Sequence, residues 1–169
     1  DPIHEAAAFF NRFLCRRKAA EWRLLMKLSD LINDAKTDIL IPKIDAEISS
    51  VCYDSRKATE GALFVCLRGA LTDGHKYARS AYDRGCRCFV CEERPQNLPD
   101  DATVLISSDT RSALALLASA FFGHPEKRMR LIGITGTKGK TTTALMIKSI
   151  LDECGLPTGY IGSNGVDFA

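Results

Sequence analysis

The sequence has no long apolar run, little net charge and few histidines. None of its stretches reaches 18 consecutive apolar residues, so no transmembrane helix is expected in the 169 residues. The formal net charge is only +2, which gives no field of the kind that nucleic-acid-binding domains carry. A secretory signal pattern is also missing. We therefore expect no membrane span, no nucleic-acid partner and a cytoplasmic location.

The cysteines do not have the pattern of a disulfide framework or of a zinc site. There are seven, an odd number, in apolar or strand-like contexts, which suits a reducing compartment. "GCRCFVCEE" places Cys86, Cys88 and Cys91 close together, but no fourth Cys or His lies nearby to complete a tetrahedral site. Residues two apart in a strand share a face, so Cys91 is expected to point away from the other two. We expect buried strand cysteines and no zinc. His75, like the other two histidines, is expected to be a surface or hydrogen-bonding residue.

The pattern from Met26 onwards is that of an α/β protein. The apolar content of 46% is typical of a globular chain. Asp109 is a good N-cap for a helix that ends before Gly123, and Ser29 is expected to cap a short helix through Ala35. Apolar runs predict strands at 48–54, 62–67, 86–92 and 103–107, and periodicity predicts helices at 76–85 and 110–122.

Three segments follow from this pattern. Residues 26–123 are expected to form one small domain, and residues 124–169 to begin a second, with the boundary at His124-Pro125. Residues 1–25 are expected to be a basic helical extension, because they carry five Arg or Lys side chains beside a group of aromatic residues. Such a helix binds a membrane surface or a partner in some proteins, and in others it is an upstream segment that packs elsewhere.

The stretch "ITGTKGKTTT", residues 134–143, has the context of a phosphate-binding loop. An apolar run at 130–134, expected to be a strand, precedes it, and a helical pattern that ends at Gly155 follows it. Glycines let backbone N–H groups turn towards a phosphate, and a helix N-terminus adds partial positive charge. Lys140 would reach the β- and γ-phosphates, and the Thr141 hydroxyl would ligate Mg²⁺. The glycine spacing is not the usual one, so an ordinary turn with a surface lysine remains the alternative.

These residues resemble the Mur ligases of peptidoglycan synthesis. "ITGTKGKTTT" is similar to the ATP loop of that family, and "YDSRKATEGALFVCLRGALTDGHKYARSAYDRGC" is similar to its N-terminal domain, which binds the UDP of a UDP-muramoyl peptide. The resemblance covers the chain from about Met26 to its end. It implies a small α/β UDP-binding domain followed by the first strand, phosphate loop and helix of a central ATPase domain.

Two types within the family have such an N-terminal domain. The MurE type adds the third peptide residue, and the MurF type adds the terminal D-Ala-D-Ala dipeptide. "LASAFFGHPEKRMRLIGITGT" and "GYIGSNG" resemble the MurE type, whereas the MurF type usually has Ser in place of Thr137. Lys138 departs from the family, which more often has Asn there.

The resemblance also implies roles for individual residues. Gly136, Thr137, Lys138, Gly139, Lys140, Thr141 and Thr142 would hold ATP, with Lys140 and Thr141 acting in catalysis and Thr141 as a Mg²⁺ ligand. The Tyr53 backbone and Ser55 would contact the uridine or its diphosphate, and Ala70, Leu71 and Thr72 would line the same pocket. The alternative for Tyr53 and Leu71 is packing in the core, and for Ser55 a hydrogen bond within a turn.

The implied chemistry is ATP-dependent formation of an amide bond through an acyl phosphate. Its substrates would be a UDP-N-acetylmuramoyl dipeptide and an amino acid, and the protein would be a monomer. The family's other active-site residues do not match any part of this chain. We therefore expect an N-terminal fragment of a ligase that is not itself active. The competing class is a stand-alone UDP-sugar-binding module without catalysis.

Overall fold

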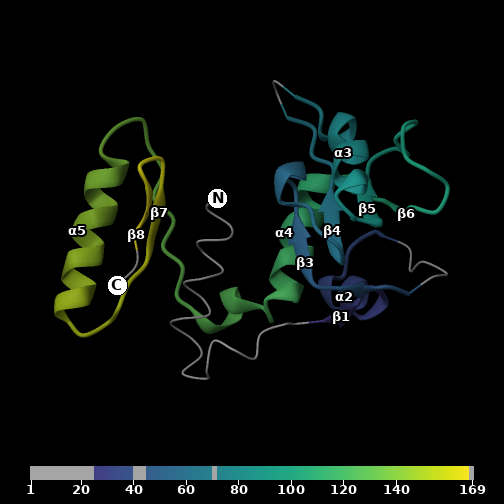
Figure 1. The fold of residues 1–169 in the computed structure, drawn as a ribbon. Helices are drawn as coiled ribbons and strands as arrows, with labels where there is room; N and C mark the ends of the chain where they lie inside the picture. Colours follow the sequence, from purple (N-terminus) through teal and green to yellow (C-terminus); the bar gives the residue numbers. More distant parts are fainter. Residues whose placement is uncertain (1–24, 40–44, 70–71, 168–169) are drawn as a thin grey trace. The chain divides into compact units, whose positions relative to one another are not determined.

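The computed structural model describes residues 25–39, 45–69 and 72–167 (Figure 1). The expected basic extension therefore lies almost wholly outside the described residues. Of the described residues, those up to Pro125 form one compact unit and those from Glu126 form another. No helix among the described residues is both long and apolar enough to cross a membrane.

A four-stranded parallel sheet forms the centre of the first unit. Its strands follow the chain in the order β3 (Ser50–Cys52), β4 (Ala62–Val65), β5 (Cys88–Cys91) and β6 (Thr103–Ile106). Every residue of β4 and β5 is buried. Uninterrupted apolar strands are typical of a parallel sheet covered on both faces, because both sets of alternating side chains enter a core. The expectation of an α/β fold is confirmed.

Helices cover both faces of this sheet (Figure 1). Helices α2 (Leu28–Ala35) and α4 (Thr110–Phe121) share one core with Leu63 and Val65 of β4. Helix α3 (Ala78–Asp83) contributes to the other core, with Phe64 and Phe89. The rings of Phe64 and Phe89 meet edge to face at a centroid distance of 6.1 Å. Successive residues of a strand thus enter opposite cores, as the pleat requires.

The caps of the helices confirm one prediction and correct another. Asp109 caps α4 by accepting from the N–H groups of Arg111 and Ser112, and Gly123 follows the helix at a φ of +71°, as predicted. Ser29, in contrast, lies inside α2. Its N–H and hydroxyl both donate to the carboxylate of Asp45, at 3.0 Å each. A residue 16 positions away therefore accepts a hydrogen bond from a free N–H of the first turn of this helix, and no local sequence pattern could indicate that partner.

All four predicted strands are shorter than expected, and for the first two a hydrogen bond marks the reason. The run 48–54 divides between β2 (Glu47–Ile48), which pairs antiparallel with β1 (Met26–Lys27), and β3 in the main sheet. The division falls at Ser49, whose N–H donates to Gly61 O at 2.8 Å. Strand β4 ends two residues before the predicted end. There the Leu67 carbonyl accepts from Gly74 N–H, so the chain turns back on itself.

The predicted arrangement of the three neighbouring cysteines is partly wrong. Cys88 faces the core that contains α2 and α4, and Cys91 faces the opposite core, as expected. Cys86 shares the core of Cys91 and not that of Cys88, because β5 begins only at Cys88 and the strand alternation does not extend back to Cys86. All three side chains are buried. Burial raises the pKa of the Cys86 thiol to about 11.

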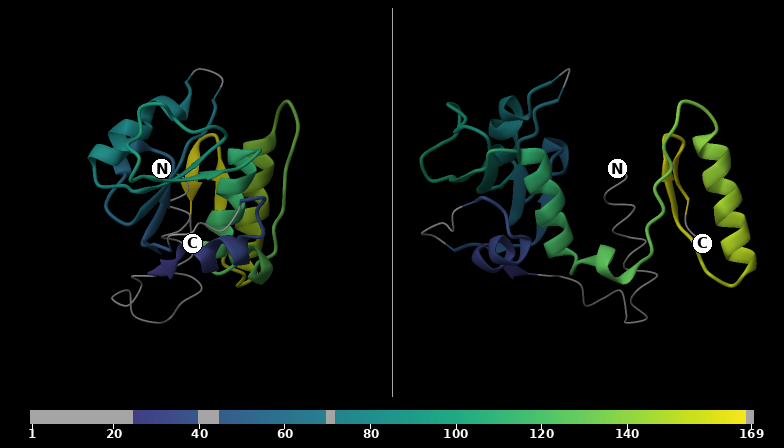
Figure 2. Two further views of the ribbon diagram at one scale, coloured as in Figure 1. Left: turned by 90° about the vertical axis from the view of Figure 1, so that its right-hand side faces the viewer. Right: turned by 180° about the vertical axis from the view of Figure 1, so that it is seen from behind.

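The second unit consists of a helix and a hairpin. Helix α5 (Lys140–Glu153) follows the 3-10 turn η3 (Pro125–Arg128), and strands β7 (Tyr160–Gly162) and β8 (Gly165–Asp167) form an antiparallel hairpin. The hairpin lies alongside α5 (Figure 2). Lys148 joins them, since its Nζ lies 2.7 Å from Asp152 on the helix and 3.7 Å from Asp167 on the hairpin.

The strand predicted at 130–134 does not form. Residues 130–136 have no regular secondary structure, and Leu131 and Ile132 are 71% and 60% exposed. A strand requires a neighbouring strand to complete its hydrogen bonds, and the described part of this unit places none beside residues 130–134. The helix after the loop does form, and Gly155 follows it at a φ of +73°, as predicted for a C-terminal cap.

Candidate functional site

The first candidate site is the edge of the sheet at which the four parallel strands end. Polar residues follow every strand at this edge: Asp54 and Ser55 after β3, Arg68 after β4, Glu92 after β5 and Ser107 after β6. In open α/β sheets, ligands bind outside the carboxyl ends of the strands. Of the predicted UDP-contacting residues, Ser55 comes shortly after β3, and Thr72 lies in the segment that follows the adjacent strand β4.

Ser55 begins a short 3-10 turn, η1 (Ser55–Lys57), immediately after β3. Asp54 caps this turn through its bond from Arg56 N–H and also forms an ion pair with the Arg56 guanidinium at 2.8 Å. Those bonds, that of the side chain first, lower the pKa of Asp54 to about 2. The Tyr53 side chain is half-buried and packs against the core on the α2 and α4 side, so its ring takes the alternative, core-packing role.

The described residues 68–69 and 72–73, called the turn 68–73 below, form the part of this edge next to β4. The backbones of Arg68 and Asp73 form an isolated antiparallel β-bridge, and Gly69 N–H donates to Thr72 O at 2.9 Å. Gly74 follows the turn and packs against the backbone of Leu67: a side-chain Cβ at this position would lie 2.7 Å from Leu67 N and O. Thr72 is exposed. The predicted contacts at positions 70 and 71, Ala70 and Leu71, lie outside the described residues.

Five further residues at this edge were not predicted as part of a site. The guanidinium of Arg68 lies 3.2 Å from Glu92 Oε2 and 2.5 Å from Glu93 Oε1. His75 is 8% exposed, so it is a hydrogen-bonding residue and not a surface one. It contacts Asp73 and the backbone of Glu92. The dipeptide Asp73-Gly74 before His75 was a visible turn signal, but the partner of the ring is 17 residues away.

The second candidate site is the glycine loop that precedes α5. Gly136 and Gly139 have φ values of +148° and +78°, a region that side chains rarely adopt. Lys140 is the first residue of α5, and its Nζ lies 2.6 Å from Gly136 O. The ammonium group thus lies over the loop that it closes. The residues of the loop are exposed, and Thr141 is half-buried.

The electrostatics of this loop suit an anion. The first turn of α5 contains no acidic residue, and its N–H groups point out of the helix N-terminus. Lys138 and Lys140 add two positive charges. The residues present therefore fit the phosphates of a nucleotide. Across the described ranges, no group of three or more His, Cys, Asp or Glu side chains is arranged to hold a metal ion.

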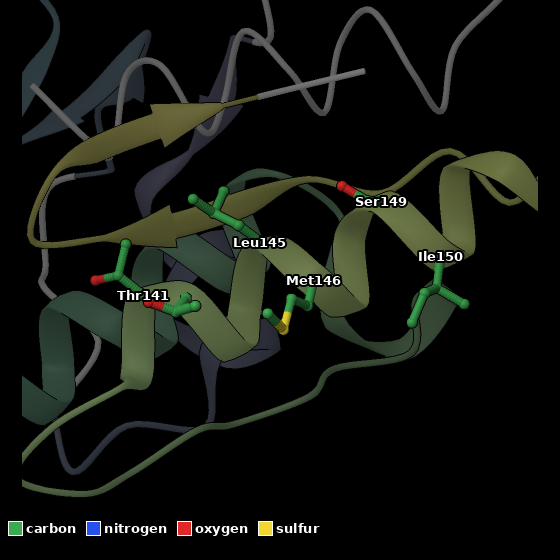
Figure 3. A pocket seen from close by; sticks show the side chains of 6 residues that line it. Thr141, Leu145, Met146, Ser149 and Ile150 are labelled. Atoms are coloured by element: carbon green, nitrogen blue, oxygen red, sulfur yellow. The ribbon is translucent and has the colours of Figure 1, made fainter.

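A shallow depression lies further along α5. Its lining includes Leu145, Met146 and Ile150, together with the hydroxyl residues Thr141 and Ser149 (Figure 3). Met146 and Ile150 are 62% and 63% exposed, and none of the residues of α5 is buried. Its lining is mostly apolar and carries no positive charge, so the candidate phosphate site is the loop at the start of α5 and not this depression.

Two family models match the chain. The model described as "Mur ligase family, catalytic domain" matches residues 47–122, and the one described as "Mur ligase middle domain" matches residues 134–168. The chain belongs to the Mur ligase family. The first match contains the sheet with its polar edge, and the second begins at the glycine loop, so each candidate site falls within a segment that the family models match.

Curated relatives and solved structures from this family are similar to the chain. It is 49% identical over 119 residues to the "UDP-N-acetylmuramoyl-L-alanyl-D-glutamate--2,6-diaminopimelate ligase" of Clostridium botulinum, covering 69% of this chain and 25% of the relative. It is 44% identical over 138 residues to the protein of the same name from Syntrophomonas wolfei, covering 82% and 28%. A crystal structure of MurF from Acinetobacter baumannii matches with a TM-score of 0.56 at 28% identity, covering 76% of this chain and 28% of that one. The chain thus spans about a quarter of the length of the curated relatives.

Proposed function

We propose that this chain is part of a MurE-type ligase, which uses ATP to add the third amino acid to a UDP-N-acetylmuramoyl dipeptide in peptidoglycan synthesis. The observation that carries the proposal is the glycine loop that Lys140 closes over Gly136 at the start of α5. This loop supports an ATP site in a chain whose relatives are named as ligases of this substrate. Those names also support 2,6-diaminopimelate, and not lysine, as the added residue.

At the sheet edge, the proposed role is to bind the UDP end of the substrate. Ser55 and Thr72 offer hydroxyl groups beside adjacent strand ends, and the Tyr53 backbone precedes Ser55 at the same edge. The ring of Tyr53 stays in the core, which leaves only its backbone for the ligand. Hydroxyl and backbone groups suit the uracil edge and the ribose, both of which present donors and acceptors.

The glycine loop has the proposed role of holding the phosphates of ATP, which supplies the phosphoryl group for the reaction. Gly136, Thr137, Lys138, Gly139 and Thr142 would bind the phosphates, largely through backbone N–H groups that turn towards them. Lys140 would offset the charge that develops as the phosphoryl group is transferred, and the Thr141 hydroxyl would ligate Mg²⁺. Positioning and charge neutralisation are the protein's contributions to such a reaction.

Two alternatives to the MurE type are each disfavoured by a specific observation. The MurF type would add D-Ala-D-Ala, and the matched solved structures are MurF proteins, but at 28–29% identity compared with 44–49% for the two diaminopimelate ligases. A binding module without catalysis would need no phosphate loop. We further propose that the protein is a cytoplasmic monomer and that its partners are small molecules: ATP, the UDP-muramoyl dipeptide and the amino acid.

The test is made on the full-length protein in which this sequence occurs. We expect release of ADP with UDP-N-acetylmuramoyl-L-Ala-D-Glu, Mg-ATP and diaminopimelate together, and none when the amino acid is left out. Lysine in place of diaminopimelate tests the choice of amino acid. Turnover only with the UDP-muramoyl tripeptide and D-Ala-D-Ala would instead establish the MurF type. No turnover with either pair, with UDP binding retained, would favour the binding module.

A further inference from the structure

The imidazole of His75 joins two segments of the sheet edge. Its Nδ1 lies 2.6 Å from Asp73 Oδ1, at the end of the turn 68–73. Its Nε2 lies 3.2 Å from the backbone nitrogen of Glu92, directly after β5. The ring is 8% exposed, so both contacts are made largely away from water. It therefore ties the turn after β4 to the end of the neighbouring strand.

The two contacts determine which nitrogen carries the proton. A backbone N–H only donates, so the Glu92 N–H needs Nε2 as an acceptor and Nε2 carries no proton. Nδ1 is then protonated and donates to the Asp73 carboxylate. The bond from His75 N–H to the same Oδ1, at 3.0 Å, holds the carboxylate in place. These bonds lower the pKa of Asp73, that from the His75 backbone first.

A second link between the turn and β5 exists at its other end, but it is exposed. The Arg68 guanidinium pairs with Glu92 and Glu93, and the side chains of Arg68 and Glu93 are 48% and 69% exposed. Exposed ion pairs contribute little, whereas buried hydrogen bonds that lose a partner are costly. His75 is accordingly the stronger of the two links.

We propose that His75 is a positioning residue of the UDP site, which holds the turn 68–73 against the end of β5 as the neutral imidazole protonated at Nδ1. The proposal rests on the proposed UDP-binding role of this edge. Thr72 is part of the turn, and its carbonyl accepts from Gly69 N–H. A turn that moves away from the end of β5 would carry Thr72 away from the sheet edge, and the ligand would have to restore the arrangement at a cost in affinity.

Two substitutions separate the two contacts in the 169-residue chain. His75→Asn keeps an amide donor for Asp73 and loses the acceptor for Glu92 N–H. His75→Gln places an amide oxygen where Nε2 was and loses the donor to Asp73. We expect either change to weaken UDP binding in calorimetry by roughly three- to tenfold, the worth of one hydrogen bond. Amide exchange at Gly69 and Glu92 should become faster in His75→Asn.

The control is Leu117→Ala, which removes a fully buried side chain of α4 and lowers stability without touching the turn. It should leave UDP affinity unchanged below its melting temperature. Nitrogen NMR of the unsubstituted chain should show His75 protonated at Nδ1 alone. Protonation at Nε2, unchanged exchange at Gly69, or UDP affinity that only follows stability would each overturn the proposal. If the unsubstituted chain binds no UDP, the proposed function of this edge is wrong, and exchange and tautomer still decide whether His75 holds the turn.

Discussion

Replacing Lys140 by alanine should weaken the binding of Mg-ATP to this chain. A charge-assisted hydrogen bond contributes roughly 1.5–3 kcal/mol, so the loss of one to a phosphate would cost on the order of tenfold to a hundredfold. In the structure, however, Lys140 Nζ already binds Gly136 O at 2.6 Å. A phosphate has to displace this contact, and the loop is exposed, so we expect the lower end, about tenfold.

The matched control is Lys138→Ala in the same loop. It removes the same charge two residues away, from a side chain that is likewise exposed. An exposed ion pair between Lys138 and a phosphate contributes roughly 0.2–1 kcal/mol, so the loss should be no more than about fivefold and should fade in high salt. Calorimetric titrations with Mg-ATP at two salt concentrations compare the variants. Tight binding that is indifferent to Lys140→Ala would refute the phosphate-loop interpretation, and equal losses would show that only net charge matters.

Three further predictions concern the first unit. Three bonds from Ser107 and Ser108, that of the Ser108 hydroxyl first, lower the pKa of Asp38 from 3.8 to about 2. The pKa of Asp38 is lower in the folded state, so its stabilisation is present above about pH 4 and is lost as the pH falls towards 2. Asp38→Asn should therefore make the free energy of unfolding, measured with urea, fall less steeply between pH 4 and pH 2. An unchanged dependence on pH would contradict this prediction. Gly74→Ala should lower the free energy of unfolding by roughly 1–3 kcal/mol, because its Cβ would lie 2.7 Å from Leu67 N and O, whereas Gly133→Ala, with nothing within 4 Å, should be neutral. Elemental analysis should find no zinc, because Cys88 faces one core while Cys86 and Cys91 face the other; one zinc per chain would show this arrangement to be wrong.

The parts of the fold that were predictable depend on residues close together in the sequence. The apolar runs around Phe64 and Phe89 predicted β4 and β5, because a strand covered on both faces has no polar alternation. Asp109 and Gly123 predicted both ends of α4, since a cap acts within three residues of the helix end. The glycine loop and the start of the following helix were predictable for the same reason.

The parts that were not predictable depend on distant partners. The chain passes from one sheet to the other at Ser49, where the Ser49 N–H donates to Gly61 O. At the start of α2, the Ser29 N–H donates to the carboxylate of Asp45. His75 is placed by the backbone of Glu92, which no local pattern contains. The run 130–134 has the composition of a buried strand, yet composition does not provide the neighbouring strand that would complete its hydrogen bonds.

The central claim is that residues 26–123 bind the UDP end of a muramoyl peptide at the carboxyl edge of the sheet. Calorimetric titration of the 169-residue chain with UDP-N-acetylmuramoyl-L-Ala-D-Glu tests it most directly. We predict binding that is tighter than that of Mg-ATP, because α5 beside the phosphate loop has no buried residue to hold it rigid. Ser55→Ala should weaken it roughly three- to tenfold without a change in melting temperature, while Ser163→Ala, an exposed serine of the second unit, should leave it unchanged. No binding, or binding that Ser55→Ala does not alter, would contradict the claim.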